Sequence, residues 1–217
     1  MKTLFKLSSL LITATLLLSL SCKKKKNEPA PSNPLPPDNA SEVITTFKLL
    51  LTDSATSTVY TFMYKDPDGD GGQAGFYGPG TSSLSTQSDS VFNLSPNTTY
   101  FTEIVLLDET KSPVDSISNE VEEEGQDHMF FFNSTNPTGS PYSLTLGGSG
   151  IHLIYTDLDG GSPQRGIGLK TRWRTYAATG TTKHPLNIIL KHQPGTKNGT
   201  ITPGDTDVDV NFKMTVQ

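Results

Sequence analysis

Short segments of alternating apolar and polar residues constrain the fold of this chain more than any other feature. The clearest one ends the sequence: its apolar positions are Val208, Val210, Phe212, Met214 and Val216, and its polar positions are Asp207, Asp209, Asn211 and Lys213. Because successive side chains of a strand point to opposite faces, this period of two predicts a strand with its apolar face buried and its polar face exposed. Further apolar segments of strand length occupy residues 43–51, 60–64, 98–107, 128–133, 151–156, 170–176 and 186–192.

Turn residues separate these segments. Clusters of Gly, Pro and Asp lie at 68–72, 77–80 and 202–205. Only residues 117–125 indicate a helix, because Ile117 and Val121 are four positions apart and Gly125 is a typical stop. The chain has 19 Gly, 15 Pro and only 18% charged residues, which excludes a helical bundle or a coiled coil. We therefore expect an all-β protein, an antiparallel β-sandwich of the immunoglobulin-like or a related type, with one short helix.

Charge divides the expected sandwich into two parts. Residues 42–136 carry 15 acidic and 3 basic side chains, whereas residues 137–217 carry 5 acidic and 8 basic ones. Two half-domains with opposite charge would attract one another. The chain from residue 42 to 217 is therefore either one continuous sandwich or two packed sandwiches built from similar halves, and its length favours a single compact unit.

The first residues predict an export signal. Lys2 and Lys6 precede an apolar stretch at 10–18 that is too short to span a bilayer. The stretch ends in Leu-Ser-Leu-Ser-Cys, which resembles the lipobox of bacterial lipoproteins in the loose form of the Bacteroidota. This resemblance implies that residues 1–21 are a lipoprotein signal peptide and that Cys22, the only cysteine, is lipidated with fatty acids such as palmitate. A secretory signal with an accidental cysteine is the alternative.

Residues 22–41 predict a tether rather than a folded segment. Four lysines follow Cys22 directly, and five prolines between positions 29 and 37 stiffen the chain toward polyproline II. Acyl chains on Cys22 would anchor the protein in a membrane, and the lysines would lie against anionic headgroups. We expect an outer-membrane lipoprotein on the periplasmic face. The surface-export signal of Bacteroidota lipoproteins is a run of acidic residues directly after the cysteine. This chain has four lysines there, so it does not resemble that signal.

One acidic turn has the spacing of a calcium loop. Asp66, Asp68 and Asp70 alternate as in D-x-D-x-D-G, so their three carboxylates can converge on one hard cation. The twelfth loop position is a tyrosine where an EF-hand needs glutamate, so further ligands have to come from elsewhere, with Asp157 or Asp159 as candidates. Ca²⁺ is therefore a candidate ligand, and a solvated acidic turn between strands is the alternative.

Histidines are the candidate ligands for a softer metal. His128 opens one apolar segment and His192 ends another, which can bring both to the same rim of a sandwich. With Asp127 or the acidic residues 122–124 they would form a transition-metal site or hold a haem. No two histidines have the spacing of a ligand pair along the chain, so structural or exposed histidines are the alternative.

One expected strand carries a cationic stripe. Lys170, Arg172 and Arg174 alternate with other residues, so three cations share one face while Trp173 points toward the core. Such a stripe suits an acidic partner, or the phosphates of lipid A or a glycan. A solvated strand face is the alternative.

Three serines stand in a possible glycosylation motif. Ser54, Ser90 and Ser116 each follow an aspartate and precede an aliphatic residue, which resembles the acceptor motif of periplasmic O-glycosylation in Bacteroidota. All three lie in expected loops, where a glycan is tolerated. Their modification would agree with an exported chain.

Motifs of common enzymes are missing from the sequence. It contains no G-x-S-x-G, no H-E-x-x-H and no Walker A loop. A lipidated Cys22 leaves no cysteine nucleophile. A net charge of −5 argues against binding to nucleic acid. We therefore expect a protein that is not an enzyme.

The order of the motifs resembles a group of small Bacteroidota envelope lipoproteins. Its elements are the lipobox and lysine tether, then VITTFKLLLT, DPDGDGG, NTTYFTEIVLLDE, EVEEEGQDHMFFF, TDLDGG and LKHQPG. The resemblance covers nearly the whole mature chain and implies an envelope location and a β fold, without a mechanism. The leading hypothesis is a binding or accessory module of an outer-membrane uptake complex that contacts a protein or a glycan. A metal- or haem-handling lipoprotein using His128 and His192 is the second, and a calcium-stabilised structural module is the third.

Overall fold

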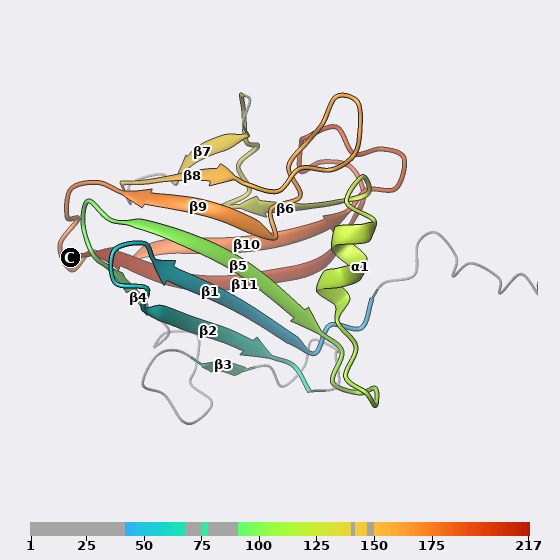
Figure 1. Cartoon of the computed structure of the whole chain (residues 1–217), viewed down its shortest axis with the longest axis horizontal. Helices are drawn as coiled ribbons and strands as arrows, with labels where there is room; N and C mark the ends of the chain where they lie inside the picture. Colours follow the sequence, from blue (N-terminus) through green and yellow to red (C-terminus); the bar gives the residue numbers. More distant parts are fainter. Residues whose placement is uncertain (1–41, 68–74, 78–90, 140–141, 147–149) are drawn as a thin grey trace, which may run out of the picture. The chain divides into compact units, whose positions relative to one another are not determined.

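Two β-sheets and one short helix form the folded body of the protein (Figure 1). The computed structural model describes residues 42–67, 75–77, 91–139, 142–146 and 150–217. The elements in chain order are β1 (Thr46–Asp53), β2 (Val59–Lys65), β3 (Gly75–Tyr77), β4 (Val91–Leu94), β5 (Thr99–Leu107), α1 (Ile117–Glu123), β6 (His128–Phe132), β7 (Ser143–Leu146), β8 (Ile151–Tyr155), β9 (Lys170–Thr175), β10 (His184–His192) and β11 (Asp205–Val216). The expected all-β class, with one short helix, is confirmed.

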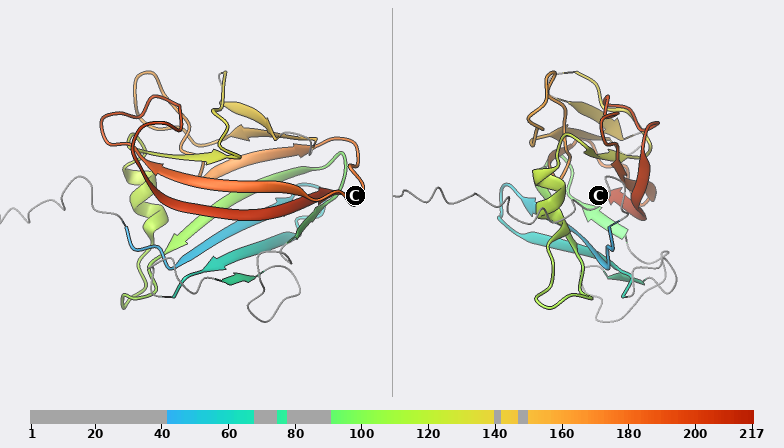
Figure 2. Two further views of the ribbon diagram at one scale, coloured as in Figure 1. Left: turned by 180° about the vertical axis from the view of Figure 1, so that it is seen from behind. Right: turned by 90° about the vertical axis from the view of Figure 1, so that its right-hand side faces the viewer.

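The larger sheet has seven strands in the order β3-β2-β1-β5-β9-β8-β7, and the smaller has four in the order β4-β11-β10-β6. Neighbouring strands run antiparallel, except that β4 pairs with β11 in parallel. The sheets face one another as the two layers of a sandwich, most plainly in the side view of Figure 2. Helix α1 lies across one end of the sandwich (Figure 1).

Aromatic side chains from both sheets fill the space between the layers. Phe62 of β2 stacks on Phe92 of β4, with ring centroids 3.4 Å apart, and Phe92 also meets Phe212 of β11 edge to face. Farther along, Phe132 of β6 stands at 90° to the ring of Trp173 in β9. Each of these five rings is at most 3% exposed. Burial of a Phe side chain contributes about 1.5–3 kcal/mol, so these contacts hold the two layers together.

The halves 42–136 and 137–217 do not form separate sandwiches. The seven-stranded sheet takes β1, β2, β3 and β5 from the first half and β7, β8 and β9 from the second, and the four-stranded sheet is mixed in the same way. An ion pair between Lys170 and Glu122, 3.0 Å long, joins the basic half to the acidic one. The opposite charges of the halves therefore meet within one body.

Secondary structure follows the hydrophobic pattern closely wherever the segments are long. Each strand expected from an apolar segment is present, and α1 buries Ile117 and Val121 as its spacing predicts. The pattern missed β3, β4 and β7, which have only three or four residues each. Among the described residues, no helix is long and apolar enough to cross a membrane. Cys22 and the segments expected to form a signal peptide and a tether lie outside the described residues.

Candidate metal centre at the rim of the four-stranded sheet

Two histidines lie face to face where β6 begins and β10 ends. The two strands are antiparallel neighbours, and their register places His128 directly opposite His192. Side chains of directly opposed residues share one face of a sheet, about 5 Å apart at Cβ. The imidazole rings accordingly stack, with centroids 4.4 Å apart and planes inclined by 8°. His128 is fully buried and His192 is 8% exposed, so the expected meeting of these residues at one rim is observed.

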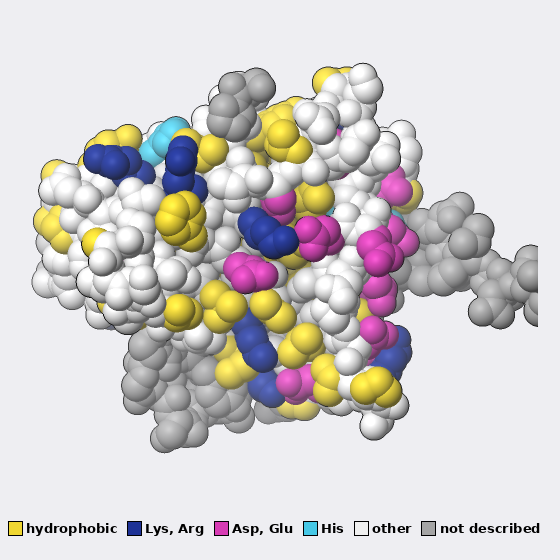
Figure 3. Space-filling view, in the orientation of Figure 1, with side chains coloured by type: hydrophobic (Ala, Val, Ile, Leu, Met, Phe, Trp, Pro, Cys, Tyr) yellow, Lys and Arg dark blue, Asp and Glu magenta, His cyan; other side chains and the backbone are white. Residues whose placement is uncertain are grey.

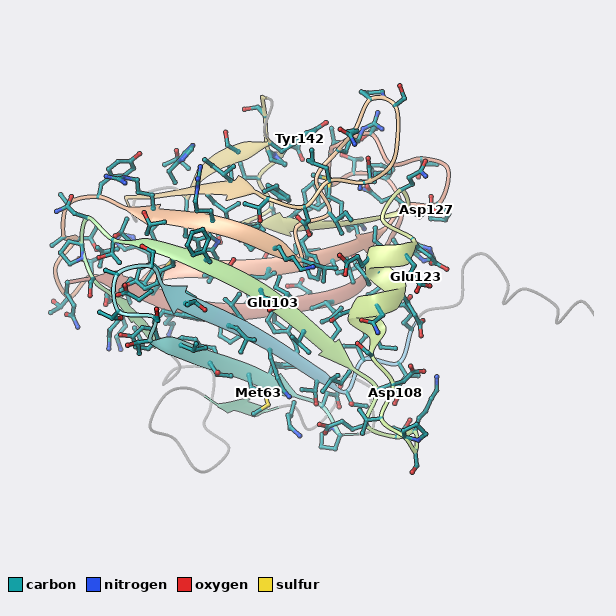
Figure 4. The ribbon with its side chains drawn as sticks, viewed as in Figure 1. Met63, Glu103, Asp108, Glu123, Asp127 and Tyr142 are labelled. Carbon is teal, nitrogen blue, oxygen red and sulfur yellow. The ribbon has the colours of Figure 1, made fainter. Side chains whose placement is uncertain are left out.

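Three carboxylates from three further segments approach the histidine pair. Glu42, which precedes β1, places Oε1 3.8 Å from His128 Nε2, and Asp207 of β11 places Oδ2 4.0 Å from the same nitrogen. On the opposite edge of the ring, Glu124 at the end of α1 places Oε2 3.9 Å from Nδ1. Glu123 on α1 and Asp127 just beyond it are labelled in Figure 4 and mark this end of the molecule.

Asp207 reaches this site because of a β-bulge. The register between β10 and β11 passes from Leu190 opposite Val208 to Lys191 opposite Thr206, so Asp207 has no partner across the ladder. An extra residue of this kind bends the strand and redirects its side chain. The alternating pattern predicted that Asp207 would be exposed with the other aspartates, and this prediction is wrong, because its side chain is only 3% exposed.

These groups offer the donor atoms of a metal site. Glu124, His128 and His192 each present a ligand atom, and the three atoms all lie within 4.8 Å of one another. Within the described part of the chain, His128 Nε2, Glu42 Oε2 and Asp207 Oδ2 are buried atoms without a hydrogen-bond partner. A buried polar atom without a partner is costly, so three such atoms near one another favour the binding of a cation or a proton there.

The electrostatics of the site also favour a bound cation. Burial, and then repulsion from Asp207, Glu120 and Glu124, raise the pKa of Glu42 to about 7. Burial also raises the pKa of Asp207. Burial and the neighbouring His192 lower the pKa of His128 to about 4, so its imidazole is neutral near pH 7 and can donate a lone pair. The acidic residues on α1 add negative potential on this side of the molecule (Figure 3).

A bare ion fits this environment better than a haem. His128 is enclosed by protein on all sides, whereas an axial haem ligand must face an apolar slot. A cavity of about 450 Å³ opens beside α1, but its lining includes Gln126, Asp157 and Lys170 and neither histidine of the stacked pair. Asp127, the other expected ligand, instead accepts a hydrogen bond from the Gly195 N–H and anchors the loop after β10.

The expected calcium ligands are not brought together in the part of the chain that the structure describes. Asp66 is buried at the end of β2, while Asp68 and Asp70 lie outside the described residues. Asp157 accepts hydrogen bonds from the N–H groups of Gly168 and Lys170. Asp159 accepts them from its own loop and pairs with Lys197 at 2.9 Å. The carboxylates of Asp157 and Asp159 are therefore already used in hydrogen bonds and an ion pair within the fold.

The cationic stripe has the predicted geometry. Lys170, Arg172 and Arg174 are exposed on the outer face of β9, and Trp173 is buried on the inner face. Glu122 pairs with Lys170, and the Arg174 guanidinium lies 5.9 Å from the centre of the Tyr176 ring. Arg172 stands between them as an exposed cation.

The candidate glycosylation sites fall partly within the described residues. Ser54 is exposed in the turn after β1, and Ser116 is half-buried at the start of α1. Ser90 lies outside the described part of the chain. Both described serines are in loops or caps, as expected, and their modification stays a prediction.

The fold and this site together define a β-sandwich with a candidate metal centre at one rim. No protein family, curated protein or solved structure that was compared with the chain matches it. The function of this chain is therefore inferred from the residues of the site. Sequence reasoning found His128, His192 and the 122–124 run but missed Glu42 and Asp207, for which neither motif nor spacing gives a signal.

Proposed function

We propose that this protein is a membrane-anchored envelope lipoprotein that binds a divalent first-row transition metal ion, without being an enzyme. The observation that carries the proposal is the buried, neutral imidazole of His128 among three carboxylates, with its Nε2 lacking a hydrogen-bond donor in the described structure. Such a group binds a cation at a lower desolvation cost than a fully exposed cluster, because His128 and Asp207 are already buried.

The donor atoms restrict the class of ion. Imidazole nitrogen and carboxylate oxygen together suit Zn²⁺, Mn²⁺ or Fe²⁺, whereas Ca²⁺ prefers oxygen ligands alone and Cu⁺ prefers thiolate or thioether sulfur. The chain has one cysteine, at position 22, far from His128 in sequence. A borderline divalent ion is therefore the proposed ligand, and storage or delivery of that ion in the envelope is the proposed role.

A second candidate function has a separate observation in its favour. The outer face of β9 presents Arg172 and Arg174 as exposed cations beside the exposed aromatic ring of Tyr176. This combination suits an anionic protein or glycan, as an accessory module of an outer-membrane uptake complex would need. The two functions are compatible, since the stripe and the metal centre lie on different elements.

Metal titration of the purified full-length protein tests the proposal. After removal of metal with EDTA, calorimetry with Zn²⁺ is expected to show one site per chain, and Zn²⁺ at 100 times its Kd should stabilise the fold by about 2.7 kcal/mol. His128→Gln, which keeps much of the side-chain volume, should abolish binding. His152→Gln is the matched control, because His152 lies on β8 of the other sheet. Unchanged binding by His128→Gln, or no binding by the wild type, would refute the proposal.

A further inference from the structure

The geometry points to the Nε2 edge of His128 as the seat of the ion, with Glu42 and Asp207 as the carboxylate ligands and His192 as a stacking support that does not bind the metal. This inference rests on the proposed function and goes further, because it assigns the ligands and makes the ion a bridge between the two sheets. The site is then a one-histidine, two-carboxylate centre for Zn²⁺, Mn²⁺ or Fe²⁺.

The two nitrogens of His128 have different surroundings. Nδ1 lies 3.3 Å from the backbone carbonyl oxygen of Glu124, so the neutral tautomer that donates from Nδ1 is favoured. Nε2 then carries the lone pair, and it is buried without a hydrogen-bond donor in the described structure. A hydrogen bond from the far nitrogen to a carbonyl is the usual way in which a metal-binding imidazole is oriented.

The two carboxylates on the Nε2 edge each lie close to ligand distance from that nitrogen. Bonds of about 2.0–2.2 Å to nitrogen and oxygen place two ligand atoms of a tetrahedral ion roughly 3.3–3.5 Å apart. Glu42 Oε1 at 3.8 Å and Asp207 Oδ2 at 4.0 Å from Nε2 are each a few tenths of an ångström beyond this separation. One oxygen of each carboxylate also lacks a hydrogen-bond partner among the described residues.

The stacked geometry argues against His192 as a second ligand. A metal ion bound to an imidazole nitrogen lies in the plane of that ring, along the lone pair. The planes of His128 and His192 are inclined by only 8° and their centroids are 4.4 Å apart, so one ion cannot lie in both planes. His192 therefore fixes the orientation of His128 by stacking against it. Glu124, whose side chain is 58% exposed, supplies its carbonyl oxygen rather than its carboxylate.

Binding by Glu42 would make the ion a link between the two sheets. Glu42 lies four residues before β1 of the seven-stranded sheet, whereas His128 and Asp207 belong to β6 and β11 of the four-stranded sheet. An ion held by all three would join the layers at this rim. It would also fix the first residues of the body, next to the segment that the sequence predicts to be a tether.

Substitutions of the residues beside each nitrogen of His128 distinguish the two possible positions of the ion. In Zn²⁺ titrations of the full-length protein, Glu42→Gln and Asp207→Asn are each expected to weaken binding by about tenfold or more, as loss of a direct ligand does at least as much as loss of an outer one. Glu124→Gln, which keeps the backbone carbonyl, and His192→Phe, which keeps an aromatic ring for stacking, should weaken binding less than either of these two substitutions. Glu123→Gln on α1 and Asp209→Asn on β11 are the matched controls and should bind like the wild type.

The opposite pattern overturns the inference. Loss of binding in His192→Phe or Glu124→Gln, with retention in Glu42→Gln and Asp207→Asn, would place the ion on the Nδ1 edge and leave the proposed function intact. X-ray absorption of the zinc-loaded wild type gives a second readout that does not depend on the folding of any variant. One imidazole per zinc supports the inference, and two overturn it. Failure of the wild type to bind Zn²⁺ refutes the proposed function itself.

Discussion

The imidazole of His128 lies parallel to that of His192, with ring centroids 4.4 Å apart. Burial and the neighbouring imidazole both lower the pKa of His128, so its ring is neutral near pH 7. It joins the first residue of β6 to the last residue of β10, at a rim that carboxylates approach from two sides. The imidazole of His128 is therefore neutral and can accept a cation through a nitrogen lone pair.

Membrane attachment through Cys22 is open to a direct test. Radiolabelled palmitate is expected to enter the wild-type protein, and Cys22→Ser should move the protein from the membrane fraction to the soluble fraction, because no acyl chain can then anchor it. Ser21→Ala is the matched control and keeps a small residue before the cysteine. Membrane fractionation of Cys22→Ser would contradict the lipoprotein assignment.

The contact between the two sheets predicts a large difference between two phenylalanines. Phe92 is fully buried against Phe62 and Phe212, whereas Phe101 is 53% exposed on the outer face of β5. Phe92→Ala is expected to lower the free energy of unfolding by about 3–5 kcal/mol through a cavity between the layers. Phe101→Ala should change it by no more than about 0.5 kcal/mol. Denaturant unfolding measures both, and similar values would contradict the sandwich packing.

The ion pair of Asp159 with Lys197 is buried, and its loss should be costly. The side chains are 1% and 2% exposed, and Lys197 also donates to the carbonyl oxygen of Gly125. Asp159→Asn leaves the ammonium without its partner and is expected to cost about 3–5 kcal/mol. The control is Glu109→Gln, which removes the partly exposed pair with Lys65 and should cost at most about 1 kcal/mol.

The stabilisation from Asp159 should depend on pH in a defined direction. Burial by itself raises the pKa of this carboxyl, but hydrogen bonds from Arg165, Lys197 and Gly161 outweigh burial and hold the pKa below the ordinary 3.8. The folded state thus favours the charged form, so the contribution is complete above pH 3.8 and is lost as the pH falls through the folded pKa. The difference in unfolding free energy between wild type and Asp159→Asn should shrink below about pH 4. A difference that grows on acidification would contradict this assignment.

A glycine in the β10–β11 connection is expected to tolerate no side chain. Gly204 has φ of +79°, and a Cβ there would overlap the carbonyl oxygen of His192. Gly204→Ala should therefore cost more than the roughly 1–2 kcal/mol of left-handed strain alone, and it should displace His192 from its stack. Gly180→Ala is the matched control, because its φ is +69° and nothing lies within 4 Å. Thermal unfolding compares them, and equal costs would contradict the overlap.

The local sequence pattern predicted the long strands of this chain but not its shortest ones. Alternation along 208–216 and the apolar segments before it determined the strand content, because burying one face of a strand depends only on the period of two. The same rule placed Arg172 outside and Trp173 inside. The rule did not predict the short strand β4, because four residues are too few to show a period of two. Its pairing with β11 makes this segment a strand.

The site shows where sequence reasoning stops. The sequence by itself determined that His128 and His192 stand at strand ends, and so could meet. Only the tertiary structure decided that they are direct partners, because register is a relationship between strands. It also brought in Glu42, which is 86 positions from His128 in the chain, and turned Asp207 inward through a bulge that the alternating pattern could not show. Burial and charge at one point in space depend on all of these segments together, so they are properties of the folded protein.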